Sequence, residues 1–238
     1  MRVLFIYWGS PGNPTASTLT TDLSDEFYNQ GHQVTVIVPL EKKYYQDTHL
    51  VVKNINYEIL YVRTGNFFNL SSKLEKVITV FTLARDILKG IMYHLGTRKF
   101  DLIITRAPFL GDPKLVIPLK QYFKCPVYLL LFDIFPQTAW DLGVIKYRVA
   151  YNFFKCREKK MLAQFDAIWC TSPGNARYVF SQYKELDFGK IEWIYNFGQI
   201  KPPPVIDRLT IRRSMGYTDN DFIALFGGNM GIPQKLEN

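Results

Sequence analysis

Short apolar runs alternate with stretches of helical periodicity along most of the chain. Residues 3–8 form an apolar run that leads into a Gly/Pro-rich segment, which predicts a buried strand followed by a loop. Apolar residues at helical spacing over 16–27 predict a helix, and Gly31 ends it. Residues 33–38 form a second strand, closed by Pro39. Because both strands are almost continuously apolar, this unit predicts parallel pairing in a sheet that is covered on both faces.

The same alternation continues to residue 195, and it predicts a doubly wound parallel α/β sheet of the Rossmann-like kind. The further strands are predicted at 57–62, 102–105, 127–132, 167–170 and 191–195, and the further helices at 73–95, 114–123, 147–163 and 174–182.

The composition changes at Lys201, which precedes three consecutive prolines that make a stiff, extended connector. Beyond it the pattern predicts a short helix over 207–215, an apolar strand over 222–226, a Gly-rich loop over 227–231 and the first turn of another helix at 234–238. We therefore predict one domain over 1–200, and over 201–238 a linker with the incomplete start of a second, Rossmann-like domain. An apolar strand without its own sheet seeks a partner, so we expect residues 222–226 to dock on a neighbouring surface, pair in a homodimer or be poorly ordered.

Composition adds charge to this picture. Of 238 residues, 47% are hydrophobic and 21% charged, which supports a large core, and the net charge is +8. A basic surface attracts nucleotides, nucleic acids or anionic lipids; the alternative is an ordinary, slightly cationic soluble protein. The three cysteines form no C-x-x-C pair, which fits reduced thiols in a cytosolic protein. Neither a signal peptide nor a transmembrane segment is predicted.

Ligands of open α/β sheets bind where the strands end, so the residues after each strand are the candidates for chemistry. The loop at 9–13 suits a phosphate or an acceptor, although a plain turn is the alternative. It lacks the third glycine of G-x-G-x-x-G, and the second strand ends without an acidic residue, which disfavours a dinucleotide site. Asp133 follows the most apolar strand and is placed to hold a hydroxyl or act as a base, or else to cap its turn.

The Gly-rich loop at 227–231 offers backbone amides that suit a diphosphate, and Lys235 could add a point charge; the alternative is a simple turn. The three histidines suggest no Ser-His-Asp triad. The Asp219-Asn220-Asp221 sequence is better explained by a turn than by a metal site, so we expect no metal. No nucleic-acid partner is expected either.

Two stretches, 73–99 and 147–160, mix large apolar residues with lysines and arginines. Helices of this composition can lie on an anionic membrane surface. The alternative is ordinary sheet-packing helices whose basic faces are solvated.

Several of these landmarks together resemble retaining GT-B glycosyltransferases of group 1, closest to the capsule, O-antigen and colanic-acid type. The opening strand with Gly31-His32-Gln33-Val34 resembles the family's first strand and G-H-x-V turn. Residues 132–136 (FDIFP) resemble its D-x-W-P segment, with Phe135 in place of Trp. Glu158 with the following FDAI and Thr171-Ser172 resembles the stretch E…A-D-x-I…S, and 194–196 fits the strand before the interdomain crossing. Residues 228–234 resemble G-N-x-G-x-x-Q-G, except that Lys235 replaces the final glycine.

The resemblance implies transfer of a hexose-type sugar from a nucleotide diphosphate sugar to an acceptor, such as a polyprenyl-diphosphate-linked glycan in a surface polysaccharide pathway. It implies no cofactor beyond the donor substrate. Asp133 would be the catalytic residue that orients or deprotonates the acceptor hydroxyl. The acceptor site would comprise Gly12, Asn13, Arg106 and Asp133, and the donor site Gly228, Asn229, Gly231, Gln234 and Lys235.

The family's acidic E-x7-E segment has no counterpart in these 238 residues. We therefore expect this chain alone to be incomplete or weakly active. The alternative is a non-catalytic fragment or the acceptor-binding subunit of a split glycosyltransferase, and a nicotinamide-linked oxidoreductase is disfavoured. The expected location is the cytoplasm, with peripheral attachment to the inner face of a bacterial membrane as its extension.

Overall fold

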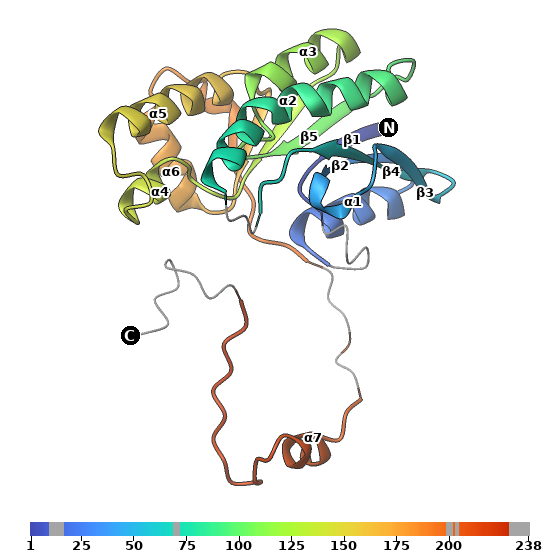
Figure 1. Ribbon diagram of the computed structural model, residues 1–238, viewed down its shortest axis with the longest axis vertical. Coiled ribbons are helices and arrows are strands. Elements are labelled where there is room, and N and C mark those ends of the chain that lie inside the picture. Colours follow the sequence, from blue (N-terminus) through green and yellow to red (C-terminus); the bar gives the residue numbers. More distant parts are fainter. Residues whose placement is uncertain (10–16, 69–71, 199–201, 203–204, 229–238) are drawn as a thin grey trace. The chain divides into compact units, whose positions relative to one another are not determined.

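A computed structural model of the 238-residue chain describes residues 1–9, 17–68, 72–198, 202 and 205–228. The chain divides into two compact units, Met1–Gly198 and Gln199–Asn238. The first unit contains the sheet and its helices (Figure 1).

The first unit is built on an eight-stranded sheet with the order β3-β4-β2-β1-β5-β6-β7-β8. All neighbouring strands pair in parallel except β3 and β4, which are antiparallel. The described strands are β1 (Arg2–Ile6), β2 (Gln33–Glu41), β3 (His49–Asn54), β4 (Tyr57–Thr64), β5 (Leu102–Arg106), β6 (Val127–Leu131), β7 (Ala167–Cys170) and β8 (Ile191–Trp193). This confirms the predicted doubly wound, mostly parallel sheet.

Helices cover the two faces of the sheet unequally (Figure 1). The helices of this unit are α1 (Leu19–Asn29), α2 (Lys73–Leu95), α3 (Pro113–Phe123), α4 (Gln137–Asp141), α5 (Arg148–Leu162) and α6 (Pro173–Gln182), with 3-10 turns η1 (Lys42–Tyr44) and η2 (Phe188–Lys190). Leu4 and Ile6 of β1 point into the core shared with α2, α3, α5 and α6, whereas Val3 and Phe5 pack on the side of α1. The alternation follows from the two-residue period of a strand.

Local sequence signals begin several of these helices. Thr18 caps α1 in a capping box with Thr21, and Ser72 and Ser172 accept backbone N–H groups at the starts of α2 and α6. Asp112 caps α3, whose first residue is a proline. These caps fix where each helix leaves the end of the preceding strand and so shape the edge of the sheet.

The second strand is longer than predicted, and its end corrects one inference. β2 continues through Pro39 and Leu40 to Glu41, so an acidic residue does close it. Pro39 is tolerated because β1 pairs with β2 only as far as Ile37, where the Tyr7 amide donates to the carbonyl. Beyond that point β2 needs a partner only on the side of β4.

Among the described strands and α-helices of the first unit, β3 and α4 were not predicted. β3 has only three apolar residues, Leu50-Val51-Val52, between polar ends, and four of its six residues are exposed, so it lacks the longer apolar run of a buried strand. The register of its pairing with β4 shifts between Val52 and Asn54, which marks a bulge. The five-residue helix α4 follows Pro136 and buries none of its residues.

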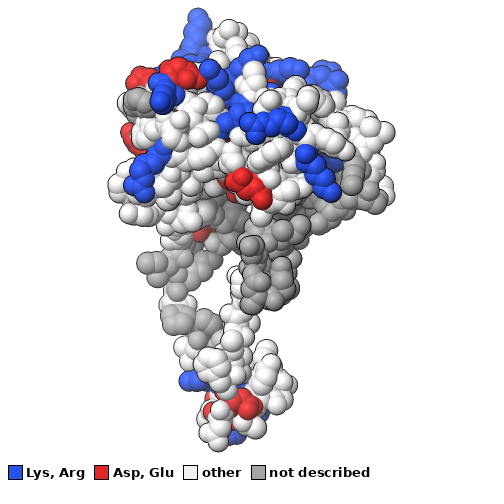
Figure 2. All heavy atoms as spheres, turned by 90° about the vertical axis from the view of Figure 1, so that its left-hand side faces the viewer, with Lys and Arg blue, Asp and Glu red and all other residues white. Residues whose placement is uncertain are grey.

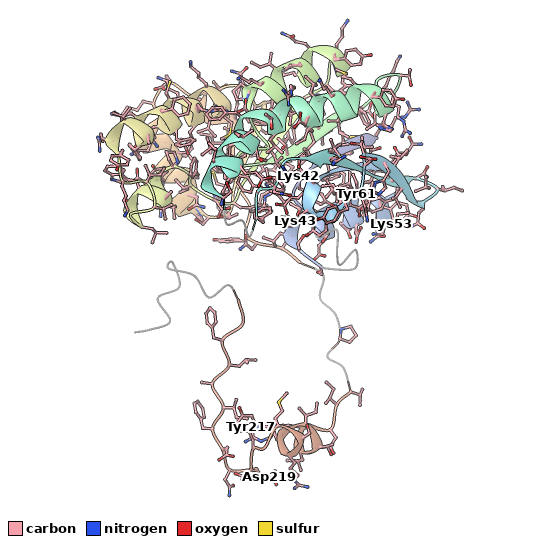
Figure 3. The ribbon with its side chains drawn as sticks, in the orientation of Figure 1. Lys42, Lys43, Lys53, Tyr61, Tyr217 and Asp219 are labelled. Carbon is pink, nitrogen blue, oxygen red and sulfur yellow. The ribbon has the colours of Figure 1, made fainter. Side chains whose placement is uncertain are left out.

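The second unit contains one helix within its described residues, α7 (Arg208–Ser214), which Asp207 caps as predicted. Tyr217 and Asp219 (Figure 3) belong to the turn after α7, where Arg213 pairs with Asp219 at 3.1 Å. The Thr218 amide donates to Asp221 at 2.6 Å, so these acids form a turn, as the sequence suggested. The strand predicted at 222–226 is wrong: no strand is present there, because the described part of this unit offers no second strand to pair with.

Candidate functional site

A pocket of about 310 Å³ opens at the edge of the sheet where the parallel strands end. It lies beside the point where the chain order reverses, because β1 has β2 on one side and β5 on the other. Its lining combines strand ends with the start of α1: Thr18, Leu19, Thr20, Arg106, Phe132, Asp133, Thr171 and Asn196. The sequence predicted two of these, Arg106 and Asp133, and the structure brings them together.

Arg106 is the last residue of β5 and provides the positive charge of the pocket. Its side chain is only 24% exposed, and its guanidinium lies over the Phe132 ring, 5.0 Å from the centroid. Burial lowers the pKa of Arg106 while the neighbouring Asp133 opposes that shift, and the group still stays cationic at neutral pH. Its Nε atom is buried without a hydrogen-bond partner among the residues that the structure describes. An acceptor group of a ligand would satisfy it.

Asp133 follows β6 by two residues and is 66% exposed, so its carboxylate reaches the open side of the pocket. Its nearest charged neighbour is Arg106, with 3.9 Å between Oδ2 and Nη2. In the described ranges Asp133 accepts no hydrogen bond from its own turn, so the capping role weighed for it is not observed there. The carboxylate is therefore free to accept a hydrogen bond from a bound hydroxyl.

The rest of the lining is uncharged and polar. Thr18 and Thr20 come from the start of α1, Thr171 follows β7, and Asn196 follows β8. Sequence reasoning did not assign these residues to a site, although each stands directly beyond a predicted strand or at a helix start. Hydroxyl and amide groups around one cation and one carboxylate suit a polyhydroxylated ligand that carries a negative group.

Aromatic contacts position the loop that carries Asp133. The ring of Phe135 lies 5.3 Å from Phe109 and 5.1 Å from Phe154 of α5. Phe109 in turn lies 5.2 Å from Phe67, in the loop after β4. The loops after three strands are thus packed on one another, which fixes the backbone on either side of the pocket.

A partly buried polar network holds the next turn of the chain. Gln137 of α4 accepts hydrogen bonds from Tyr151 at 2.7 Å and Tyr178 at 3.3 Å. The Tyr178 hydroxyl also accepts a hydrogen bond from Lys155, and Lys155 forms an ion pair with Glu158 at 3.0 Å. Glu158 is 6% exposed and accepts a hydrogen bond from Tyr183 as well. Burial raises the pKa of Glu158, against the lowering effect of these partners. This glutamate therefore has a structural role, because it joins α5 to Tyr183, the residue that directly follows α6, and does not line the pocket.

Glu41, at the end of β2, is not available to a ligand. It is buried and accepts the backbone N–H groups of Phe67 and Phe68 at 2.5 and 2.7 Å. Lys43 pairs with it at 2.6 Å, and Lys42 pairs with Glu75 at 2.6 Å at the start of α2 (Figure 3). Glu41 therefore orders the loop before α2 and does not replace the ribose-binding acid of a dinucleotide site.

The remaining predicted site residues are not placed in this pocket by the structure. Gly12 and Asn13, and the donor-site residues Asn229, Gly231, Gln234 and Lys235, lie outside the described residues. Gly228 is described and belongs to the second unit. The assignment of these residues to acceptor and donor binding stays a prediction.

The described ranges offer neither a metal-binding cluster nor a membrane-spanning helix. No group of three or more His, Cys, Asp or Glu side chains in those ranges could hold a metal ion. None of the helices described has the length and apolarity needed to cross a bilayer.

Comparison with known proteins identifies the fold. No protein-family model and no curated protein sequence matches the chain. Among solved structures, it resembles a sucrose-phosphate synthase from Thermosynechococcus elongatus, with a TM-score of 0.57 and 15% identity over 82% of this chain and 47% of that one. It also resembles a UDP-forming α,α-trehalose-phosphate synthase from Burkholderia xenovorans, in complex with glucose-6-phosphate. The TM-score is 0.53, and the identity is 11% over 74% of this chain and 42% of that one. For the glycosyltransferase of kitacinnamycin the TM-score is 0.50, and the identity is 11% over 87% of this chain and 55% of that one.

These similarities confirm the Rossmann-like fold of GT-B glycosyltransferases that was predicted. At 11–15% identity these similarities show the fold, and they do not show which group of glycosyltransferases the chain resembles most. The chain spans about half the length of these three proteins.

Proposed function

We propose that this chain is the acceptor-binding part of a glycosyltransferase that moves a sugar from a nucleotide diphosphate sugar to an acceptor. The observation that carries the proposal is the pocket at the carboxyl edge of a GT-B sheet, with Arg106 and Asp133 facing each other across 3.9 Å. In open α/β folds this edge is where ligands bind. The fold supports the reaction class, and the pocket supports the acceptor side of it.

Asp133 orients the acceptor hydroxyl in this proposal, or removes its proton as the new glycosidic bond forms. Arg106 binds a negative group of the same acceptor, since its buried Nε lacks a partner among the described residues and its charge is only loosely neutralised. The donor diphosphate would bind the Gly-rich segment 228–231, whose amides suit the charge that grows on the leaving group.

The acceptor that fits these features is a polyprenyl-diphosphate-linked glycan of the kind used to build capsule or O-antigen chains. Its diphosphate would supply the anion for Arg106 and its sugar the hydroxyl for Asp133. Such an acceptor would place the reaction at the inner face of a bacterial membrane. Dimerisation through residues 222–226 stays a separate prediction, to be tested by sedimentation of the purified chain.

The test is Asp133→Asn in the full-length enzyme, assayed for sugar transfer and for binding of the nucleotide sugar. We expect the transfer rate to fall by about 10²–10⁴-fold, because the amide cannot take up the proton, while donor affinity stays within about twofold. Asp141→Asn is the matched control, since Asp141 lies in α4 and, among the described residues, its side chain accepts a hydrogen bond only from Gln137, at 2.8 Å. An unchanged transfer rate in the Asp133 variant would remove its catalytic role.

The alternative, a non-catalytic acceptor-binding subunit, predicts a different outcome for the 238-residue chain alone. It would bind the acceptor through Arg106 and show no transfer until a second polypeptide is added. If the chain is instead part of a single-polypeptide glycosyltransferase, sugar transfer should be restored by extending the same open reading frame and not by adding a separate protein. Robust sugar transfer by the 238 residues alone would contradict both hypotheses, the non-catalytic subunit and the part of a longer enzyme.

A further inference from the structure

The outward faces of α2 and α5 carry apolar side chains where a helix facing water carries polar ones. Phe153 is 46% exposed and Val149 is 83% exposed, and the other members of the set lie between these values. Exposed apolar clusters of this kind mark interaction surfaces. We call this set the apolar band; it comprises Leu74, Val77, Ile78 and Phe81 of α2 with Val149 and Phe153 of α5.

The two helices contribute to one continuous surface. The rings of Phe81 and Phe153 lie 6.4 Å apart, and both helices belong to the same layer over the sheet (Figure 1). The Arg157 guanidinium lies over both rings, 5.6 Å from the centroid of Phe81 and 5.7 Å from that of Phe153. Arg157 also pairs with Asp112, so its charge is balanced within the protein, and its contact with both rings serves to hold the two helices together at the apolar band.

Each helix changes from apolar to basic along the same exposed stripe. On α2 the positions after Phe81 at helical spacing are Arg85 and Lys89, both exposed. On α5 the stripe continues from Phe153 to Lys160. Arg85 pairs with the neighbouring Asp86 at 2.9 Å. Lys89 and Lys160 form no ion pair within the described part of the chain, so these two are available to an external anion.

The charge of these helices is one-sided. α5 has five basic residues and one acidic residue, and that acid, Glu158, is buried. α2 has four basic and two acidic residues. Figure 2 views the unit from the side where α4 and α5 lie and shows Lys and Arg side chains spread over the upper part of that face, with few acids among them. This distribution matches a partner that presents negative charge above an apolar layer.

We infer that the apolar band and its flanking cations dock on the surface of an anionic membrane, with Phe81 and Phe153 at the level of the acyl-chain boundary. An anionic bilayer offers phosphate groups to Lys89 and Lys160 and an apolar layer to the band. A second copy of the chain fits less well, because pairing through this face would bring the same excess of lysine and arginine together.

The placement of the band relates it to the pocket. Its residues lie in the N-terminal halves of α2 and α5, the ends closest to the edge where β4 and β6 finish. From Phe153 the ring contacts continue through Phe154 to Phe135, two residues from Asp133. The inference rests on the proposed function in one respect: docking here would keep the pocket beside the bilayer that holds a lipid-linked acceptor.

Vesicle co-sedimentation of the purified 238-residue chain tests the inference. We expect binding to phosphatidylglycerol vesicles at low salt and little binding to phosphatidylcholine vesicles. Leu74→Ser with Val149→Ser should lower the partition coefficient at least about fivefold, and Lys89→Gln with Lys160→Gln about tenfold. Phe81→Ser with Phe153→Ser should have the largest effect of the apolar pairs, provided that its thermal unfolding matches the parent chain.

Matched controls separate this face from general stickiness. Val52→Ser with Ile55→Ser removes two apolar side chains that are 69% and 96% exposed at β3 and the turn after it, and should leave binding unchanged. Lys99→Gln with Lys124→Gln removes two exposed charges before β5 and β6, at the opposite edge of the sheet, and should reduce binding far less than the Lys89/Lys160 pair.

Three outcomes would overturn the inference: no binding of the parent chain to anionic vesicles, equal losses in the band and control variants, or a dimer that the band variants dissociate. Asp133→Asn should bind vesicles like the parent chain. Vesicle binding and transfer to a water-soluble acceptor are measured separately, so failure of one proposal can be told from failure of the other.

Discussion

Arg106 holds a positive charge that the surrounding protein neutralises only in part. The family resemblance implied Arg106, which directly follows the predicted strand 102–105, and Asp133 follows another predicted strand 27 positions later. Because β5 and β6 pair in parallel, these two strand ends are neighbours, and the assignment of both residues to a binding site stays a prediction. Reasoning from the ends of strands could not identify Thr18, Thr171 or Asn196 as lining residues. Hydroxyl and amide side chains are as common in ordinary turns as in binding sites, so their position in the sequence does not distinguish the two.

We expect Arg106→Gln to weaken the binding of inorganic pyrophosphate to this chain by about 10–100-fold, the loss of one charge-assisted hydrogen-bonding group. Isothermal titration calorimetry at low salt measures it. Arg63→Gln is the control, since Arg63 pairs with Asp47 on the exposed side of β4. Equal affinities in the Arg106 variant and the parent chain would show that the pocket holds no anion there.

Glu158 matched a family motif at the sequence level, yet its environment could be seen only in three dimensions. Because burial raises its pKa above the ordinary 4.5, the folded state holds its proton to higher pH than the unfolded chain does. Its contribution to stability is therefore lost as pH rises above 4.5 through the folded pKa.

We expect the melting temperature of Glu158→Gln, relative to the parent chain, to rise between pH 4 and pH 7. Glu185→Gln is the control with the opposite sign, because the hydrogen bond from Lys159 lowers the pKa of the exposed Glu185. Differential scanning calorimetry across this range decides the matter. Parallel curves for Glu158→Gln and the parent chain would mean that Glu158 titrates alike in both states.

At the scale of elements, apolar periodicity found the buried strands and long helices but missed what depends on tertiary context. β2 continues past Pro39 because β1 has already ended, and β3 exposes four of its six residues at the edge of the sheet. Both features depend on the neighbouring strands, so the local sequence does not predict them. The apolar stretch 222–226 shows the converse error: composition favours a strand, but a strand needs a partner to exist.

The packing of α2 on β4 gives a prediction for a single helical glycine. A Cβ atom at Gly90 would lie 2.8 and 2.9 Å from the two γ carbons of Val62. We expect Gly90→Ala to destabilise the protein by about 1–3 kcal/mol, despite the better helix propensity of alanine. Urea unfolding monitored by circular dichroism measures this.

Gly174→Ala in α6 is the matched substitution. Its Cβ would meet only Ser172 Oγ at 3.5 Å, an ordinary contact, so we expect no loss and a gain of up to about 1 kcal/mol. Similar losses at both positions would show that the contact with Val62 does not control the effect of Gly90→Ala.

At the scale of the molecule, the division into Met1–Gly198 and Gln199–Asn238 places the sheet, its core and the Arg106–Asp133 pocket in the first unit. The second unit exposes large apolar side chains in its described part, with Phe222 at 95% and Leu225 at 92%. Sequence alternation was sufficient for the fold class because each βα unit repeats the same signal. It could not show how the second unit covers its apolar residues.

A chain ending at Gly198 should therefore unfold like the full chain. We expect melting temperatures within about 3 °C of each other, which corresponds to about 1 kcal/mol for a protein of this size. Thermal circular dichroism measures both chains under one condition. A loss of cooperativity on removal of 199–238 would show that the first unit depends on the second.

The outer strand β3 bears on how the protein behaves when concentrated. An unpaired sheet edge invites another chain to add a strand, and here that edge carries the bulge between Val52 and Asn54. Lys53 stands at the bulge and is tied back to Asp25 at 3.1 Å. A distorted edge with a fixed charge is a poor template for intermolecular β-sheet, so aggregation from the folded state should be slow at this end of the sheet even though Val52 is largely exposed.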